Sequence, residues 1–222
     1  MIIKKMFRII IFFIITNFFT TYLFANNDFE LWVEDFKIKA VASGVSKKLV
    51  DEIMLEAVFI PKVIEYDRYQ PEFYEDTFTY IKKRSSKGKI KQGLKLYDKE
   101  KTVIEKIEKE FEVEKELLLA LMGIETNFGK YLGKMDIISS LATLSFDKRR
   151  SKFFTKELLI LLNLVDKNII DRNILYGSWA GAFGNFQFMP RTIRNYAIDY
   201  NNNKTIELKK TEDSFASAAN YL

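Results

Sequence analysis

The spacing of the apolar residues constrains the fold of this chain more than any other feature of its sequence. Beyond the first 26 residues, apolar side chains recur every three or four positions, which is the spacing of one face of an α-helix. Residues 103–111 are one example, because Val103, Ile104, Ile107 and Phe111 share a face. No segment shows the strict alternation, bounded by turns, that predicts a β-strand. The pattern therefore predicts an all-α protein.

The chain divides into three predicted parts. Helices are expected at residues 28–41, 47–59, 90–111, 136–145, 151–168, 190–200 and 212–222, and in a segment that ends at Glu125. Pro61 and Pro71 bracket a segment that is typical of a linker. We therefore expect a leader at residues 1–25, a small helical N-terminal region at residues 26–75 and the main helical domain at residues 76–222.

The chain contains neither cysteine nor histidine among its 222 residues. This composition excludes disulfides, zinc–thiolate centres, cysteine nucleophiles and lipid attachment through cysteine. It equally excludes a Ser-His-Asp triad, histidine metal sites and histidine pH switches. Acid–base chemistry near neutral pH must therefore come from Glu, Asp, Lys or Tyr side chains.

The N-terminus has the three regions of a secretory signal peptide. Lys4, Lys5 and Arg8 form a basic region, residues 9–23 are mostly apolar, and Ala25 supplies a small residue for cleavage. The uninterrupted apolar run is short for a membrane-spanning helix. The sequence thus favours a cleaved signal peptide over a retained anchor, which would hold the protein on the membrane. Both interpretations predict export.

The basic balance of the chain comes largely from its leader. The net charge is +5 for the whole chain and +2 without residues 1–25, which hold three basic residues and no acid. A nucleic-acid-binding protein would keep a stronger positive excess, so we expect no nucleic-acid partner. Residues 81–95, "IKKRSSKGKIKQGLK", hold seven basic residues and no acid. This run is more typical of a solvated helix face or loop than of a patch facing an anionic polymer.

A carboxylate closes one of the apolar helical stripes. Glu125, in "ALMGIETNFGKYLGK", shares a helix face with Leu118, Leu121 and Met122. By itself, a glutamate at a helix end is most often a surface residue in an ion pair. An apolar neighbourhood would instead disfavour the charged form, so we expect the pKa of Glu125 to be raised.

A second unusual stretch is "YGSWAGAFGNFQFMPRTIRNYAIDY", residues 176–200. Its glycines alternate with aromatic side chains, and Gln187 lies among them. The glycine spacing does not match a dinucleotide or phosphate loop, and no strand precedes it. Aromatic rings, an amide and bare backbone suit a hydroxyl-rich ligand such as a sugar. Core packing against a helix explains this composition equally well.

Together, the two stretches resemble the lytic murein transglycosylase B family of the lysozyme-like superfamily. The matching motifs are "GIETNFGKYLGK", "LATLSFDKRR", "GSWAGAFGNFQFMPRTIRNYAIDY" and "DSFASAANYL", in the family's order. The similarity is continuous from about residue 114 to residue 222 and weaker across residues 26–113. The resemblance implies a lysozyme-like catalytic domain at residues 76–222. It also implies a Gram-negative periplasm or envelope, with peptidoglycan glycan strands as the partner.

The resemblance implies that Glu125 is the catalytic residue. The family cleaves the MurNAc–GlcNAc bond and forms a 1,6-anhydro product without adding water. A protonated Glu125 would donate to the leaving glycosidic oxygen and then, ionised, would deprotonate the C6 hydroxyl of the muramyl sugar. Most glycosidases need two carboxylates. Here the substrate supplies the nucleophile, so one is sufficient.

The resemblance assigns further residues to the substrate site. Ser178 and Gln187 match the wall of the active site, and Phe188 would pack beside the cleaved bond. Tyr80 matches a groove tyrosine loosely, and Phe153 occupies a position where the family has tyrosine. The remaining match is a basic pair, Arg149 and Arg150, that would contact anionic stem peptides or remain in solvent.

The segment "DYNNNKTIELKKTED" is similar to a calcium-binding loop. The candidate ligands are Asp199, Asn201, Asn203, Thr205 and Asp213. Lys204 stands where the sharp turn normally needs glycine, and Lys210 stands at the usual bidentate glutamate position. We therefore expect a calcium-free loop and no required cofactor.

The family continues beyond the "ANYL" at which this sequence ends, so we expect a domain that is short at its C-terminus. That leaves three alternatives to the transglycosylase. They are a weakly active or inactive glycan-binding relative, a hydrolytic lysozyme, and a helical envelope adaptor that uses residues 81–95.

Overall fold

The computed structural model describes residues 27–69 and 75–222, so the predicted leader at residues 1–25 lies outside the described residues. The all-α prediction is confirmed, since the strands within these described residues amount to one two-stranded antiparallel pair with Met135 opposite Gly177. The elements after the helical residues 27–42 are α2 (Lys47–Leu55), α3 (Pro61–Arg68), α4 (Thr77–Arg84), α5 (Lys87–Phe111), α6 (Lys115–Thr126), β1 (Met135–Asp136), α7 (Ile137–Phe146), α8 (Ser151–Asp166), η2 (Arg172–Ile174), β2 (Tyr176–Gly177), α9 (Pro190–Tyr196) and α10 (Thr211–Tyr221). None of the helices in the described part of the chain is both long and apolar enough to cross a membrane.

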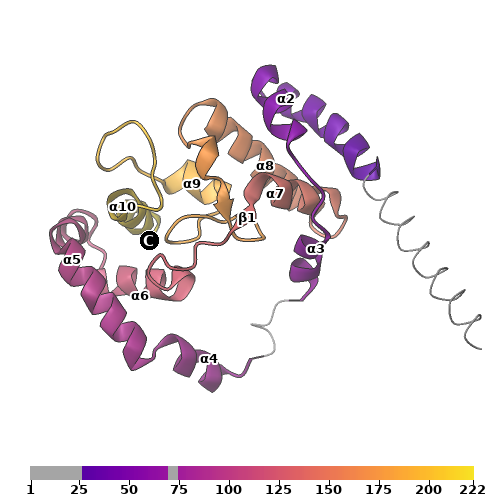
Figure 1. The fold of residues 1–222 in the computed structure, drawn as a ribbon. Coiled ribbons are helices and arrows are strands. Elements are labelled where there is room, and N and C mark those ends of the chain that lie inside the picture. The colour runs from indigo at the N-terminus through magenta and orange to yellow at the C-terminus, as the bar shows by residue number, and fades with distance from the viewer. Residues whose placement is uncertain (1–26, 70–74) are drawn as a thin grey trace, which may run out of the picture.

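Helix α7 forms the centre of the molecule (Figure 1). Every residue from Ile137 to Ser145 is buried, which is the pattern of a helix covered on all sides. Helices α8 and α3 pack on α7, and α9 packs on α8. One continuous core includes residues from Phe29 to Ala219. It therefore contains side chains from both sides of the predicted boundary after residue 75, and that boundary remains a prediction.

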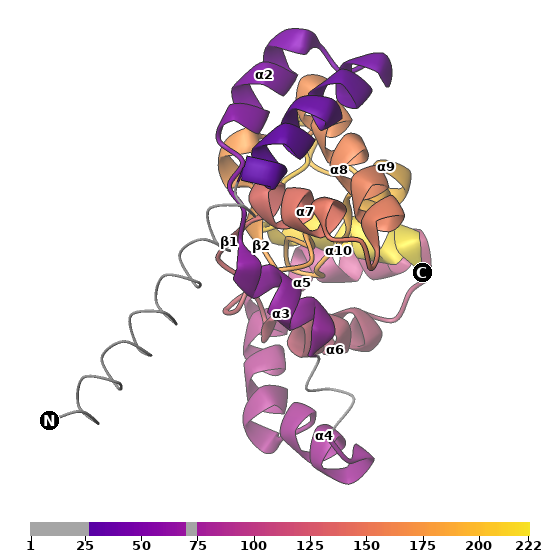
Figure 2. The same ribbon diagram turned by 90° about the vertical axis from the view of Figure 1, so that its right-hand side faces the viewer.

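The helices α5, α6 and α10 form a second group, which joins the rest of the fold where α10 packs on α9. Helix α5 packs on α6 and α10 and is interrupted at Glu100, where φ is −109° and ψ is 18°. Beyond this group, α4 and the N-terminal part of α5 project away from the body (Figure 2). We call residues 77–95 the arm.

The structure corrects three local predictions. The expected linker after Pro61 is helix α3, because proline at the first helical position has a suitable φ and needs no N–H partner. The helix predicted at residues 190–200 ends at Tyr196, since Ser217 and Asp213 accept the N–H groups of Ile198 and Tyr200 at 2.9 Å each. The third correction concerns the arm, where helix α4 was not predicted.

Ser46 occupies the N-cap position of α2, yet its hydroxyl does not cap the helix. It donates to the carboxylate of Asp166 at 2.5 Å instead. The contact joins α2 to the end of α8, 120 residues later, so a tertiary partner replaces the local one.

Candidate active site

Glu125 lies in the last turn of α6, where the apolar stripe of that helix reaches the surface. Leu118 and Met122 on this face are buried, and Glu125 itself is exposed to solvent. Desolvation by the surrounding protein nevertheless raises the pKa of Glu125, as the sequence predicted. Among the described residues, its side chain forms no hydrogen bond or ion pair. The carboxyl group is therefore open to a ligand and biased toward its neutral form.

The chain leaves α6 in a left-handed turn. Asn127, Phe128 and Gly129 have φ values of 51°, 59° and 77°. Such backbone is costly for residues other than glycine and is often found at functional sites. The turn directs the Phe128 ring between two helices, where a Cβ on Gly93 of α5 or Gly123 of α6 would lie 3.1 or 2.7 Å from its Cζ. Glycine at both positions thus makes room for the ring that follows Glu125.

A buried polar chain links the end of α6 to two distant segments. Thr126, fully buried beside Glu125, donates from Oγ1 to the carbonyl of Asn185 at 2.8 Å and accepts from the N–H of Gly129 at 3.0 Å. The amide of Asn185 donates to Ser214 of α10 at 3.0 Å. Sequence reasoning missed these residues, because a buried Thr or Asn has no local pattern that distinguishes it from a surface one.

Ser178 and Gln187 lie in the glycine-rich loop that faces this turn. Gly133 and Gly177 hold the two segments together, since a Cβ on Gly133 would lie 2.0 Å from the Gly177 carbonyl oxygen. Gln187, with φ of 50°, donates to the carbonyl of Gly184 at 2.9 Å and, at 3.4 Å, to that of Leu132. The segments that carry Glu125, Ser178 and Gln187 are therefore adjacent.

Ser178 has a partner within its own loop. Its hydroxyl accepts the N–H of Ala182 at 3.0 Å, and its own N–H donates to the Ala182 carbonyl at 2.8 Å. The hydroxyl hydrogen remains available as a donor because Oγ is the acceptor in the observed contact. The side chain is half-buried, so its orientation is held while part of its surface is accessible.

The other predicted groove residues lie in different surroundings. Phe188 is only 8% exposed and its ring packs on Phe186 and Tyr221, so it belongs to the core. Tyr80 is on α4 in the arm, where the Arg84 guanidinium lies 3.6 Å from its ring centroid. Phe153 is exposed at the start of α8. Among the described residues, no hydrogen bond, ion pair or ring contact joins Tyr80 or Phe153 to Glu125.

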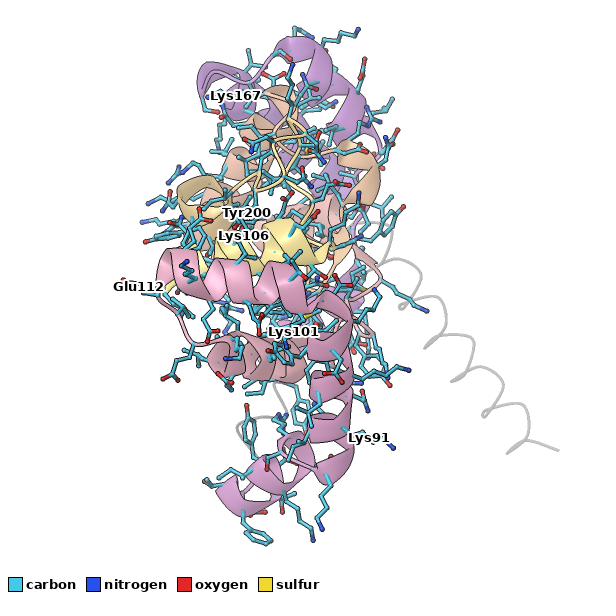
Figure 3. The ribbon with its side chains drawn as sticks, turned by 90° about the vertical axis from the view of Figure 1, so that its left-hand side faces the viewer. Lys91, Lys101, Lys106, Glu112, Lys167 and Tyr200 are labelled. Carbon is cyan, nitrogen blue, oxygen red and sulfur yellow. The ribbon has the colours of Figure 1, made fainter. Side chains whose placement is uncertain are left out.

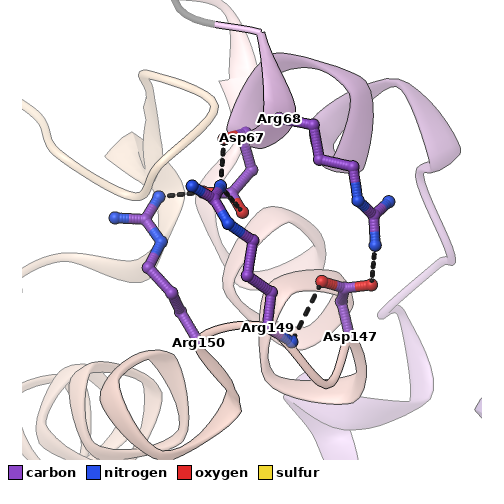
Figure 4. A network of polar contacts seen from close by, with 5 residues as sticks. All are labelled: Asp67, Arg68, Asp147, Arg149 and Arg150. Carbon is purple, nitrogen blue, oxygen red and sulfur yellow. Dashed lines mark hydrogen bonds and ion pairs between the residues drawn. The ribbon is translucent and has the colours of Figure 1, made fainter.

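Arg149 and Arg150 converge on a buried carboxylate that the sequence analysis did not identify (Figure 4). Asp67 at the end of α3 is 1% exposed and pairs with Arg149 at 2.7 Å and with Arg150. The side chain of Arg149 is still 49% exposed. Arg68 and Asp147 form a second pair at 2.7 Å. Three guanidinium groups thus share two carboxylates, and the cluster keeps one positive charge.

An aromatic pair lies next to Ser178. The Tyr66 and Trp179 rings are 6.5 Å apart, and both are partly exposed. Trp179 lies within the stretch whose composition suits either a sugar or core packing, whereas the sequence did not single out Tyr66. A partly exposed aromatic pair beside a hydroxyl donor suits the apolar face of a sugar ring.

The predicted calcium loop uses its side-chain oxygens on its own backbone. Both carboxylate oxygens of Asp199 accept N–H groups, from Asn203 at 3.0 Å and from Lys204 at 2.6 Å. The Asn203 side-chain oxygen in turn accepts the N–H of Thr205 at 2.9 Å, and that of Asn201 accepts the Asn203 N–H at 3.1 Å. Lys204 has φ of 73°, at the position where a calcium loop needs glycine.

Asp213, the distal candidate ligand, is buried and accepts two backbone N–H groups, from Tyr200 at 2.9 Å and Glu207 at 2.8 Å. Lys210 pairs with Glu207 at 2.9 Å. Within residues 27–69 and 75–222, no three acidic residues converge as a metal site would require. The lysines at positions 204 and 210 disfavour a calcium ion in this loop, and the calcium-free loop remains a prediction.

Comparisons with known proteins agree with this arrangement. The family model for the Transglycosylase SLT domain matches residues 28–222. Membrane-bound lytic murein transglycosylase B of Escherichia coli (strain K12) is 33% identical over 143 residues, which are 64% of this chain and 40% of that protein.

Solved structures are similar over most of the chain. SltB3 from Pseudomonas aeruginosa, in complex with NAG-NAM-pentapeptide, has a TM-score of 0.83 and 30% identity over 87% of this chain and 52% of that one. The lytic transglycosylase Slt35 of Escherichia coli, in complex with bulgecin A, has a TM-score of 0.77 and 29% identity over 88% and 62%. The chain thus spans about half the length of these relatives.

Proposed function

Because the chain belongs to the Transglycosylase SLT domain family, we propose that it is a peptidoglycan lytic transglycosylase. It cleaves the β-1,4 bond between MurNAc and GlcNAc and leaves a 1,6-anhydro-MurNAc end. The similarity to SltB3, solved with NAG-NAM-pentapeptide, and to lytic murein transglycosylase B supports this substrate class.

Glu125 acts first as a general acid and then as a general base. Its neutral carboxyl group donates a proton to the glycosidic oxygen, and the bond from that oxygen to C1 of MurNAc breaks. The resulting carboxylate removes the proton from the C6 hydroxyl of the same sugar. The C6 oxygen then bonds to C1, so the proton returns to Glu125 and no water is consumed.

The observation that carries the proposal is the isolation of this carboxyl group. Desolvation is the cause of its raised pKa, and no charged group among the described residues contributes to that shift. Hydrolases that retain or invert configuration normally place two carboxyl groups across the scissile bond. A lone, desolvated glutamate instead suits a substrate that provides its own nucleophile.

The surrounding residues supply substrate contacts in this proposal. Ser178 and Gln187 bind the acetamido group or position the sugar, and the partly exposed Trp179 stacks on a sugar face. Arg149 and Arg150 offer residual positive charge to the carboxylates of the stem peptide. The catalytic centre requires no metal or cofactor.

The proposal includes export to the periplasm or envelope, supported by the signal-peptide pattern at residues 1–25. N-terminal sequencing of the protein from fractionated cells tests it. A mature chain that begins near Asn26 is expected. A chain that still begins at Met1 would instead favour an anchor that holds the enzyme on the membrane.

Digestion of purified sacculi, followed by mass spectrometry of the soluble products, tests the reaction. Muropeptides ending in 1,6-anhydro-MurNAc, without new reducing ends, are expected. Reducing ends would indicate a hydrolytic lysozyme. Retention on sacculi without any product would indicate a glycan-binding protein.

A further inference from the structure

The arm, residues 77–95, carries charge of the opposite sign to the rest of the folded chain. The net charge of +5 includes +3 from residues 1–26 and +7 from residues 81–95, which leaves −5 for all other residues. Glu75 pairs with Lys83 and with Arg84, and Lys89 donates to the Gly123 carbonyl at 3.0 Å. Within the described residues, the other four arm lysines form no ion pair.

Three of these unpaired lysines, those on α5, share a face with exposed aliphatic side chains. Lys87, Ile90, Lys91, Leu94 and Lys95 are spaced at three and four residues along α5, so they form one strip. Ile90 and Leu94 are each 57% exposed. On the preceding helix α4, two further large apolar side chains are exposed, Phe78 and Ile81.

The opposite face of this part of α5 packs against the rest of the protein. Gly93 of that face lies against Phe128, and the Lys89 ammonium group caps the end of α6. The strip therefore points away from the turn that follows Glu125. Lys91 on the strip and Lys167 beyond the end of α8 lie at opposite ends of the molecule (Figure 3).

We propose that the arm is a docking surface for an anionic lipid bilayer. Exposed aliphatic and aromatic side chains among lysines are the composition of helices that lie in a membrane interface. The lysines would meet the lipid phosphates, the apolar side chains would enter the headgroup boundary, and the negative body would be held away from the surface. A purely ionic contact with a water-soluble polyanion leaves the four exposed apolar residues without a role.

Vesicle co-sedimentation tests the proposal with a chain that begins at residue 27. This chain lacks the leader but holds every core residue, since the core runs from Phe29 to Ala219. It should bind phosphatidylglycerol vesicles and not phosphatidylcholine vesicles. Binding should fall sharply at 1 M salt, where the screening length is only about 3 Å.

Matched variants distinguish the effect of the arm lysines on binding from the effect of the protein's net charge. Replacing Lys87, Lys91 and Lys95 by Gln should weaken binding at least ~100-fold, from roughly fivefold per lysine near an anionic surface. The control replaces Lys39, Lys48 and Lys167 by Gln, which removes the same charge from the opposite end and should leave binding within about twofold.

A second pair of variants tests the apolar contribution. Ile90→Ser with Leu94→Ser should weaken binding at least tenfold. Leu31→Ser with Ile38→Ser, at residues that are at least as exposed on the helical residues 27–42, should not. Unchanged circular dichroism melting curves verify that all variants fold.

Three results would overturn the proposal. The first is equal binding of the chain to neutral and anionic vesicles. The second is an equal loss of vesicle binding in the arm variants and the control variants. The third is that the arm variants keep vesicle binding but lose binding to purified sacculi. The assay involves no bond cleavage, so its outcome is independent of the proposed transglycosylase activity.

Discussion

Replacing Glu125 by Gln removes the transferable proton while keeping the shape of the side chain. In the described structure this side chain has no hydrogen bond or ion pair to lose. The change therefore acts on the chemistry and not on the surrounding packing. We expect kcat/KM on sacculi to fall by ~10²–10⁴-fold, the usual contribution of a general acid–base. This loss corresponds to about 2.7–5.5 kcal/mol of transition-state stabilisation.

The same substitution that lowers the activity should leave the folded protein at least as stable as the wild type. Desolvation raises the pKa of Glu125, so the folded state holds this proton more tightly than the unfolded chain does. The carboxyl group therefore favours folding below its unfolded pKa, and that contribution is lost as the pH rises through the folded value. At pH 7, Glu125→Gln should melt at or above the temperature of the wild type.

The assay measures anhydro-muropeptide release, retention on sacculi and the melting temperature for each protein. Glu116→Gln is the matched control, because it makes the same chemical change in the first turn of the same helix, at an exposed residue. Undiminished product release by Glu125→Gln would refute the assignment of the acid–base. A fall in melting temperature at pH 7 would refute the argument from desolvation.

Three further outcomes are expected. Gly133→Ala should lower the free energy of unfolding by at least ~2 kcal/mol more than Gly44→Ala, because both have positive φ but only Gly133 faces backbone at 2.0 Å; urea denaturation measures the difference, and equal losses would contradict it. Asp67→Asn should lower the free energy of unfolding by about 1–3 kcal/mol, which is less than the loss from a fully buried pair because the arginines that contact Asp67 are half-exposed. Asp147→Asn removes a more exposed pair and should lower the same free energy by at most about 1 kcal/mol. Calcium should not raise the melting temperature, since binding to the native state alone would raise it with concentration; a rise that disappears in Asp199→Ala would refute this.

Several helices could be predicted because their information is local. The apolar spacing in α5, α7 and α8 predicts helix without reference to any partner, and the structure has helices there. The two prolines around helix α3 favour a linker in the sequence, and this prediction is wrong. The first of these prolines in fact begins the helix. The end of α9 could not be predicted, since its next N–H groups are accepted by side chains of α10.

The candidate site likewise has features that local sequence predicts and features that depend on distant contacts. The stripe ending at Glu125 predicted the direction of its pKa shift, because the apolar neighbours lie on the same helix turn. The pairing of Asp67 with Arg149 joins residues 82 positions apart, and that of Thr126 with Asn185 joins residues 59 positions apart. No spacing rule covers such distances, so sequence reasoning left the arginines without a partner and overlooked Asp67, Thr126 and Asn185.

By itself the sequence determined the all-helical class, the exclusion of cysteine and histidine chemistry, and the placement of a glutamate at the end of an apolar stripe. These follow from residue type and from helical periodicity, which act within a few residues. Only the tertiary structure decided which polar groups are buried and paired, that Phe188 belongs to the core, and that the basic run projects as an arm. These features depend on contacts between distant segments that packing brings together. Burial then determines whether a charged group is paired, neutralised or exposed to a ligand.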